Sequence, residues 1–407
     1  MGIIVKDIGH FNIFDAIFNH FADNRLIILA QKTYMKTIVE VKSKKELAAF
    51  IDFPHDLYKN DPVYVPELFI AQRDLLTTHP FHKHSSLQCF LLYDGDKITG
   101  RVAAILNNRH NEFNGTKDGF FGFFDVINDA ESAQILIDTA VKWLKEKDNT
   151  ITNLVGPVNL TTNDSAGLLI KGFEYPPLIL TTYNAPYYEG LLENTGLKKQ
   201  VDLISWRWNK TSYDDRSVRI SDKLEERLNT RGVIIRKMNM KKFKEESAKF
   251  KLVYNSAWDK NMGFVPLTDD EFEFIAKDLK MIADPDFVLV AEKEGKFIGL
   301  AVALPDVNQI QKKIPRGRLL PTGIFKLLFG MKKIKGIRIF MLGVIEGYRH
   351  MGIEAVLYAN IIKNYKARDF EYAEAGWTLE HNHPVNNAIK AIKGDPYKIH
   401  RIYEKAI

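Results

Sequence analysis

The amino-acid sequence predicts a mixed α/β protein in which two similar halves follow one another along the chain. Apolar runs of strand length, rich in Ile, Val and Phe, alternate with segments whose apolar residues recur at helical spacing. A short helix, a glycine stop and a strand occur twice, at 188–206 and again at 387–403. The 407 residues also suit two domains of roughly 170–200 residues each, since single cores rarely grow far beyond that size.

The first half begins with a capped helix and a β-hairpin. Ser43 and Glu46 form the Ser-x-x-Glu signature of a capping box. Asp94-Gly95 lies between two apolar runs, as in a tight hairpin turn. The predicted elements of the first half are, in order, a helix over 43–58, a hairpin over 90–106, a strand over 119–126, a helix over 188–195 and a strand over 201–206.

The second half repeats this order. Glu294-Gly295 marks a hairpin turn, and Gly394 stops the last helix. The predicted elements are a hairpin with strands over 286–292 and 296–305, a strand over 337–345, a helix that opens at 353, a strand over 372–380, a helix over 384–393 and a strand over 398–404.

A boundary between the halves is predicted near 209–222, because that stretch is polar and shows no periodicity. The predicted units are a domain over 37–210 without a cofactor loop and a domain over 211–407 that carries one. The first domain should lack the loop because 128–132 contains no glycine and two acids. Residues 1–36 match neither half and are predicted to be an N-terminal extension.

The composition argues against disulfides and membrane spans. Cys89 is the single cysteine and lies inside an apolar run, which excludes a disulfide framework and a cysteine metal site. No apolar stretch reaches the ~18–20 residues that a membrane span needs. The three histidines of 79–84 are split by a proline, so no metal site is predicted. We expect a protein of the cytoplasm, a reducing compartment; the net charge of +6 by itself says little about partners.

A glycine loop from Gly347 to Gly352 is the most informative segment of the chain. It follows the apolar strand over 337–345 and opens a helix. Free backbone N–H groups and the positive end of a helix dipole favour an anionic group at such a loop. Arg349 adds a cation, and Gly352 removes a side chain where a ligand must come close. The loop therefore predicts a site for a phosphate-bearing cofactor.

The pattern Arg349-x-x-Gly352 after a strand resembles the acyl-CoA loop of the GNAT superfamily of N-acetyltransferases, with Glu354 where that superfamily places a small residue. The predicted element order of the second half is also the order of this superfamily. The segments 377–382 and 398–404 resemble a two-domain bacterial branch that includes ceramide-synthase-type N-acyltransferases. The resemblance implies tandem GNAT-like domains, of which the N-terminal copy is degenerate.

The resemblance also implies a reaction in which an amine attacks the thioester of acyl-CoA or acetyl-CoA directly, without a metal. It implies that the strand backbone near Val344 and Ile345 pairs with the pantetheine arm and supplies an oxyanion donor. Ile389 stands where many members carry the tyrosine that protonates the thiolate, so Tyr397 or Tyr403 would have to replace it. The predicted cofactor-binding residues are Val344, Ile345, Gly347, Arg349, His350, Met351, Gly352, Ile353 and Asn382.

The acceptor ammonium must lose a proton before it can attack, so a base is expected near the cofactor strand. Glu346 ends that strand, where open α/β sheets bind ligands, although an acid there also suits the first turn of the next helix. Glu380 and His381 follow the next strand and offer a second proton route. The predicted catalytic residues are Glu346, Glu380, His381 and Tyr397.

A basic segment precedes the cofactor strand. Residues 307–345 contain nine Lys and Arg, no Asp or Glu, and many Leu, Ile and Phe. This mixture predicts an amphipathic segment that contacts an anionic membrane surface through 307–338 or closes over a lipid. The alternatives are a solvated basic loop and a loop that binds the phosphates of CoA. Nucleic acid is not expected as a partner, because no known reader motif accompanies the charge.

The sequence therefore predicts an acyl-CoA-dependent N-acyltransferase. The resemblance to ceramide-synthase-type enzymes implies a long-chain sphingoid amine as the acceptor, and the basic, apolar segment fits a lipid better than a small soluble amine. Two alternatives stay open, an acetyltransferase for a small soluble amine and a non-catalytic module that binds CoA or a membrane. The long loop over 156–173 is expected to wall the acceptor site between the halves.

Overall fold

The structure is a computed structural model that describes residues 36–212, 215–258 and 262–407, so the predicted extension over 1–36 lies almost wholly outside it. The elements of the first half are β1 (Thr37–Glu40), α2 (Lys44–Leu57), α3 (Phe69–Thr77), η1 (Pro80–Lys83), β2 (Ser86–Asp94), β3 (Lys97–Leu106), α4 (Asn108–Asn114), β4 (Asp118–Val126), α5 (Ala130–Lys147), β5 (Asn153–Gly156), β6 (Val158–Asn159), β7 (Ser165–Ala166), β8 (Leu168–Lys171), α6 (Tyr188–Asn194) and β9 (Lys198–Asn209). The predicted capping box is present, with Ser43 and Glu46 each accepting the other's backbone N–H.

The second half repeats the pattern with a longer connection before its fourth strand. Its elements are α7 (Asp215–Thr230), β10 (Val233–Lys237), η2 (Met240–Lys242), α8 (Phe243–Ala257), α9 (Asp269–Ile282), η3 (Pro285–Phe287), β11 (Val288–Lys293), β12 (Lys296–Pro305), α10 (Asn308–Gln311), η4 (Pro315–Gly317), η5 (Leu319–Gly323), α11 (Ile324–Gly330), η6 (Met331–Lys333), β13 (Gly336–Val344), α12 (Ile353–Ala367), β14 (Tyr372–Leu379), α13 (His383–Ala391) and β15 (Asp395–Ala406). The predicted mixed α/β fold is confirmed.

The helix α7 begins inside the stretch 209–222, for which no periodicity was predicted, while the boundary near that stretch stays a prediction. The inner face of α7 carries Ser221, Leu224 and Leu228, spaced by three and four residues, and Leu228 is buried. Only one narrow stripe of the helix is apolar, so its charged first turns show no periodicity in the sequence.

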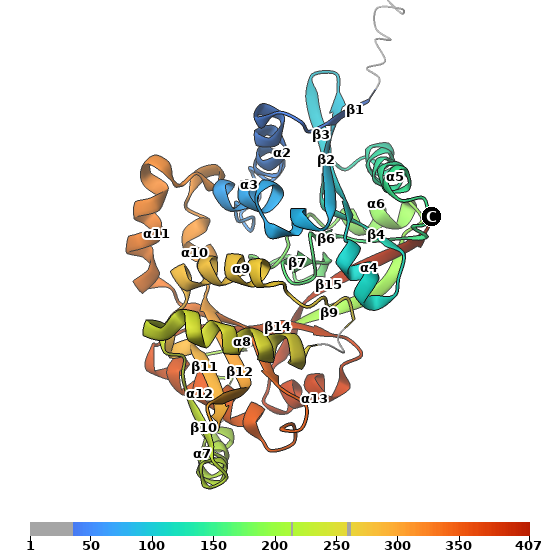
Figure 1. The fold of residues 1–407 in the computed structure, drawn as a ribbon. Helices are drawn as coiled ribbons and strands as arrows, with labels where there is room; N and C mark the ends of the chain where they lie inside the picture. The colour runs from blue at the N-terminus through green and yellow to red at the C-terminus, as the bar shows by residue number, and fades with distance from the viewer. Residues whose placement is uncertain (1–35, 213–214, 259–261) are drawn as a thin grey trace, which may run out of the picture.

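One continuous mixed sheet runs through both halves (Figure 1). Its strand order is β1-β2-β3-β4-β5-β15-β9-β14-β13-β12-β11-β10, and β8 pairs with β15. The last strand of each half therefore lies against the other half. The strand β15 bonds to β5, β8 and β9, all from the first half, while β9 bonds to β14 of the second half.

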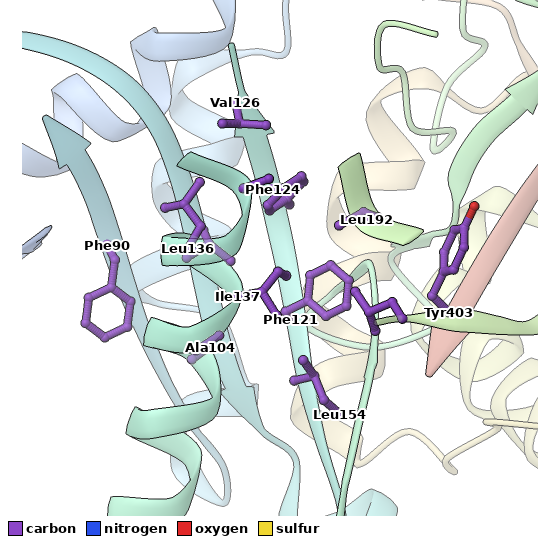
Figure 2. Close-up of a cluster of buried hydrophobic side chains, with 14 of the residues drawn as sticks. Phe90, Ala104, Phe121, Phe124, Val126, Leu136, Ile137, Leu154, Leu192 and Tyr403 are labelled. Atoms are coloured by element: carbon purple, nitrogen blue, oxygen red, sulfur yellow. The ribbon is translucent and has the colours of Figure 1, made fainter. Parts of the chain in front are cut away.

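This exchange also places side chains of the last strand in the first core. Tyr403 of β15 is fully buried among residues of the first half, including Phe121, Leu154 and Leu192 (Figure 2). In each half, helices cover both faces of the sheet. The helices α5 and α2 pack on opposite faces of the first half, and α12 and α8 do so in the second.

The exchange predicts that the second half does not fold alone. A fragment of residues 211–407 would leave β15 without its neighbours, and each buried backbone group that loses its partner costs about 1–3 kcal/mol. We expect this fragment to show no cooperative thermal transition by circular dichroism. Coexpression with residues 37–210 should restore a one-to-one complex with the transition of the intact chain. A monomeric fragment of 211–407 that melts cooperatively would contradict the exchanged arrangement.

Candidate active site

The fourth and fifth strands of the second half separate and form a wedge. The strands β13 and β14 pair in parallel only from Gly336 to Ile339. Beyond that point β13 continues against β12 to Val344, and β14 continues against β9 to Leu379. Ile345 donates its N–H to Ile298 of the hairpin, so the register points the backbone groups of Val344 and Leu342 into the wedge. An extended chain such as a pantetheine arm can therefore form hydrogen bonds with β13 in the wedge.

The corresponding wedge of the first half is filled by its own chain. The strands β4 and β5 pair only from Asp118 to Phe120 before they separate. The Asn159 side chain then accepts the N–H of Phe123 at 2.8 Å, and a Cβ on Gly122 would lie 2.1 Å from the carbonyl oxygen of Val158. The segment β6 thus occupies the space that stays between the strands in the second half.

The glycine loop has the backbone that a bound anion needs. Gly347, His350 and Gly352 all adopt positive φ, at 88°, 69° and 85°. Gly352 is the N-cap of α12 and no side chain caps this helix, so the first N–H groups of α12 have no capping side chain in competition with an anion. A Cβ on Gly352 would lie 2.4 Å from Leu224 of α7. The positive φ and the close contact with α7 both call for glycine at this position. The glycine alone is therefore not evidence of a ligand.

The other predicted loop residues hold the loop to the sheet. Arg349 donates from Nε to the carbonyl of Val344 at 3.1 Å and from a terminal nitrogen to the carbonyl of Ala257 at 3.1 Å. Its positive charge is thereby fixed at the open end of the wedge. Met351 and Ile353 pack in the core below α12, so they can offer a ligand their backbone and not their side chains.

A β-bulge at Phe340 marks the closed end of the wedge. Met341 pairs with Val302 while Ile339 pairs with Ala303, which leaves Phe340 as an extra residue on β13. The extra residue of a bulge has no partner in the ladder. The N–H of Ile345, the predicted oxyanion donor, is already bonded to the carbonyl of Ile298. The bulge was missed because it depends on the register with β12.

An apolar pocket begins at this bulge and runs between α8 and α9. It encloses about 620 Å³, including its open side. Its floor is formed by β12 and β13, with Phe340 and Met341 at the wedge end, and Lys280 lies at its rim. The remaining lining residues are Met238, Met240, Phe243, Ser247, Phe250, Tyr254, Leu267, Phe272, Ile275, Ala276, Leu279, Ala283, Val288, Val302 and Leu304. Nearly all of these groups are apolar, which suits a hydrocarbon chain.

The predicted catalytic residues do not converge on the bulge. Glu346 is exposed and lies six residues beyond Phe340, about 20 Å along an extended strand. Glu380 accepts from Lys199 at 2.7 Å and from the N–H of Asp202 at 3.0 Å, so it is held in a structural ion pair. His381 is exposed, and the Asn382 side chain caps α13.

Tyr397 belongs to a buried polar network at the closed end of the wedge. Its hydroxyl donates to Glu374, which is fully buried and also accepts from Arg338 at 2.9 Å. Burial and the charge of Glu374 raise the pKa of Tyr397 well above its usual value. Such a hydroxyl is a weak proton donor for a thiolate. Tyr403 is buried in the first core and lies apart from the wedge.

A loop of the first half supplies a carboxylate that sequence reasoning missed. The side chain of Asn163 accepts from the Tyr254 hydroxyl at 2.5 Å and donates to the carbonyl of Val265 at 3.2 Å. The next residue, Asp164, accepts a hydrogen bond from Thr161 at 2.8 Å, and burial raises its pKa to about 7. Tyr254 lines the apolar pocket, so Asp164 lies beside the pocket wall. Only the polar run 161–164 in an otherwise apolar loop could have signalled it.

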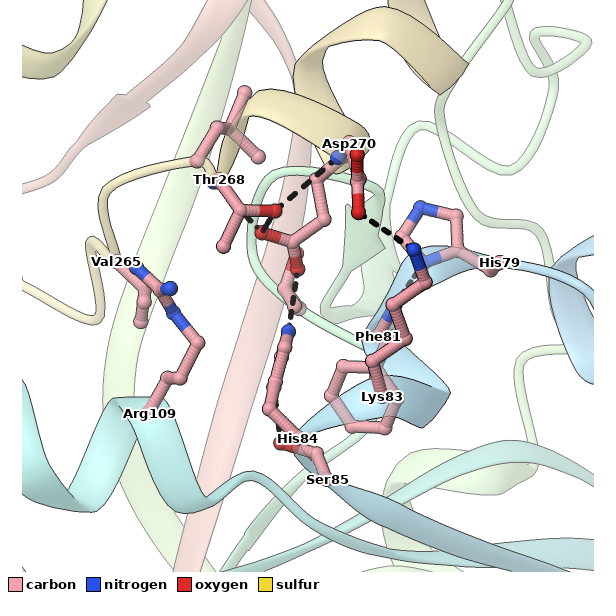
Figure 3. Close-up of polar contacts among 12 residues, drawn as sticks. His79, Phe81, Lys83, His84, Ser85, Arg109, Val265, Thr268 and Asp270 are labelled. Atoms are coloured by element: carbon pink, nitrogen blue, oxygen red, sulfur yellow. Dashed lines mark hydrogen bonds and ion pairs between the residues drawn. The ribbon is translucent and has the colours of Figure 1, made fainter.

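Two ion pairs attach the helix α9, which forms one wall of the pocket, to the first half. Lys83 pairs with Asp270 at 2.6 Å, and His84 pairs with Glu271 at 3.1 Å (Figure 3). Glu271 itself completes the capping box of α9. The histidine run therefore serves an interface between the halves. Within the described residues no cluster of His, Cys, Asp or Glu could hold a metal ion, and no helix there is long and apolar enough to cross a membrane.

Known proteins of similar sequence and fold span nearly the whole chain, although no protein-family model matches it. Protein YghO of Escherichia coli is 31% identical over 384 residues, which cover 92% of this chain and 96% of that protein. Bacterial ceramide synthase of Caulobacter vibrioides is 31% identical over 382 residues, which cover 91% and 97%.

Two solved structures share the fold. A tandem GNAT protein from the clavulanic acid biosynthesis pathway aligns with a TM-score of 0.55 at 11% identity, over 91% of this chain and 98% of its own. A GCN5-related N-acetyltransferase from Sphaerobacter thermophilus aligns with a TM-score of 0.50 at 11% identity, over 91% and 95%. These two structures share the tandem fold of the chain. That fold, together with the 31% identity to bacterial ceramide synthase, supports an N-acyltransferase. The chain therefore has the tandem GNAT fold and belongs to the family that contains protein YghO and bacterial ceramide synthase.

Proposed function

We propose that the protein transfers a long acyl chain from acyl-CoA to the amine of a long-chain, sphingoid-type base. The apolar pocket carries this proposal, because it starts at the bulge of the cofactor strand and is lined almost wholly by hydrocarbon. A pocket for an acetyl group alone would need no such lining. The name of the Caulobacter relative, bacterial ceramide synthase, supports the same substrate class.

The donor would lie along the wedge with its two ends at fixed places. The pyrophosphate would bind the loop Gly347–Gly352 and the first N–H groups of α12. The pantetheine arm would pair with Val344 and Leu342 and end where β13 and β14 meet. The thioester carbonyl would then face the N–H of Phe340, and the acyl chain would enter the pocket between α8 and α9.

The amine would approach from the side of the first-half loop. Asp164 would take a proton from the ammonium, since its pKa of about 7 suits a base at neutral pH. The amine nitrogen then bonds to the carbonyl carbon, the carbon–sulfur bond breaks, the nitrogen loses its second proton to solvent, and the CoA thiolate is protonated by solvent. Glu346 is the alternative base. Glu380, His381 and Tyr397 would help to position the site and would not transfer protons. A lipid acceptor would require peripheral contact with a membrane, for which 307–338 is the proposed region.

Filling the pocket tests the proposal directly. Ala276→Trp should leave the affinity for acetyl-CoA unchanged and lower that for palmitoyl-CoA at least about 100-fold, since each methylene kept out of the pocket forfeits about 0.8 kcal/mol. Titration calorimetry with both thioesters, below the micelle concentration, measures this, and acylation of a sphingoid base gives the turnover. Lys277→Trp, the next residue on the exposed face of α9, is the matched control.

Three results separate the alternatives. If the wild-type protein binds both thioesters equally and Ala276→Trp changes neither affinity, the acetyltransferase for a small amine replaces the lipid enzyme. Binding of palmitoyl-CoA without turnover of any amine would favour the non-catalytic module. Long-chain affinity that falls only in Ala276→Trp, together with turnover, supports the proposal.

A further inference from the structure

The segment between β12 and β13 presents four large apolar side chains to solvent. Leu320, Phe325, Leu328 and Phe329 are 79%, 57%, 63% and 75% exposed. Leu328 and Phe329 follow Phe325 by three and four residues, so the three side chains share the outer face of α11. We call these four residues the α11 surface. Contiguous apolar exposure of this kind marks an interaction site in a folded protein.

The segment is held firmly from behind, so the exposed face is not a by-product of poor packing. The inner side of α11 packs through Leu327 on the core below α12, and a Cβ on Gly330 would lie 2.8 Å from Ile310. Arg318 bonds to Asp52 at 2.7 Å, which ties the segment to α2 of the first half. In Figure 1 the helix α11 stands at the edge of the molecule, beside α10.

The segment that carries the α11 surface is rich in positive charge, and residues 307–345 contain no Asp or Glu. Its exposed cations are Lys312, Lys313, Lys326, Lys332 and Lys333. Among the described residues, no carboxylate forms an ion pair with any of these five, whereas Lys335 pairs with Asp369 at 3.6 Å. A protein partner could cover the apolar side chains, but five unmatched lysines around them call for a diffuse negative surface. Apolar side chains that insert and lysines that stay at the headgroups are the two parts of an interfacial anchor.

We propose that the α11 surface docks the protein on an anionic lipid bilayer beside the entrance of the apolar pocket. Ile282, at the end of α9, packs on the same core as Leu327 of α11. Lys280 lies at the pocket rim, and the neighbouring Met281 is 74% exposed. In this proposal, the docked rim faces the lipid surface, so that a lipid substrate enters the pocket from the bilayer. This role in substrate supply rests on the proposed function, but the docking itself does not.

Vesicle sedimentation tests the docking. The wild-type protein should bind vesicles that contain phosphatidylglycerol, bind pure phosphatidylcholine at least about tenfold more weakly, and release as salt rises. Both Phe325→Ser/Leu328→Ser/Phe329→Ser and Lys332→Glu/Lys333→Glu should lower binding to the anionic vesicles at least about tenfold. The matched controls are Leu252→Ser, which removes an apolar residue 69% exposed on α8, and Lys44→Glu/Lys45→Glu on α2.

The outcomes distinguish docking from catalysis. Absent vesicle binding by the wild-type protein, or equal binding by the α11 variants and the controls, would overturn the docking proposal. A second measurement uses the acylation rate with a soluble, monomeric short-chain amine, which the α11 variants should leave unchanged. They should lower the rate only when the amine is supplied in anionic vesicles. Vesicle binding without acylation of either amine would support the docking and contradict the proposed function.

Discussion

Replacement of Asp164 by Asn should lower turnover at neutral pH by about 10²–10⁴-fold, the usual contribution of a general base. Burial raises the pKa of this carboxyl to about 7, so the wild-type group is a base above that pH and an acid below it. The wild-type rate should therefore rise with pH up to about 7 and then level off. The rate of Asp164→Asn should lack this rise, and its affinity for acyl-CoA should stay unchanged. Initial rates from pH 5.5 to 9, with calorimetry at pH 7, measure both effects.

The matched comparison is Glu346→Gln, which removes the base that the sequence favoured. Glu346 lies about 20 Å along the strand from Phe340, so this change should affect turnover far less than Asp164→Asn. A large loss of turnover in Glu346→Gln with normal rates in Asp164→Asn would reverse the assignment. It would also move the thioester to the open end of the wedge. Tyr254→Phe removes the hydroxyl that holds Asn163 and separates a positioning effect on the loop from the loss of the base.

The elements of the fold could be predicted because their signals are local. The apolar run 337–345 and the glycines that follow it gave β13, its loop and α12 within a residue or two. The exchange of β9 and β15 could not be predicted, since both strands end a helix–glycine–strand unit and either half could have accepted either strand. The choice depends on contacts between segments about 200 residues apart, which no local pattern records.

The site residues also fall into those that local sequence predicts and those that depend on contacts between distant segments. Positive φ at Gly347 and Gly352 follows from residue type and position, so the phosphate loop was within reach of sequence reasoning. The bulge at Phe340 depends on the register with the hairpin, and Asp164 matters only because its loop bonds to Tyr254, 91 residues after Asn163. Glu380 and Tyr397 have the right chemistry by type, but the fold gives each of them a fixed partner.

Loss of Arg338 should destabilise the protein by about 3–5 kcal/mol, because Glu374 would stay behind as a buried carboxylate without its cation. Arg338 is 3% exposed and donates to Glu374, to the carbonyl of Ile179 and to the carbonyl of Gly376. It therefore joins both strands of the wedge to the first half at the point where they part. Urea unfolding of Arg338→Met at pH 7, followed by tryptophan fluorescence, measures the loss.

Two further variants show whether the loss comes from the unpaired charge. Arg338→Met/Glu374→Gln removes both charges and keeps an acceptor for the Tyr397 hydroxyl, so it should recover more than half of the lost stability. Lys142→Met breaks an exposed pair with Glu146 and should stay within about 0.5 kcal/mol of the wild type. A change below about 1 kcal/mol in Arg338→Met would mean that water reaches Glu374. The closed end of the wedge would then be wet, and a dry site for attack on the thioester would have to lie elsewhere along β13.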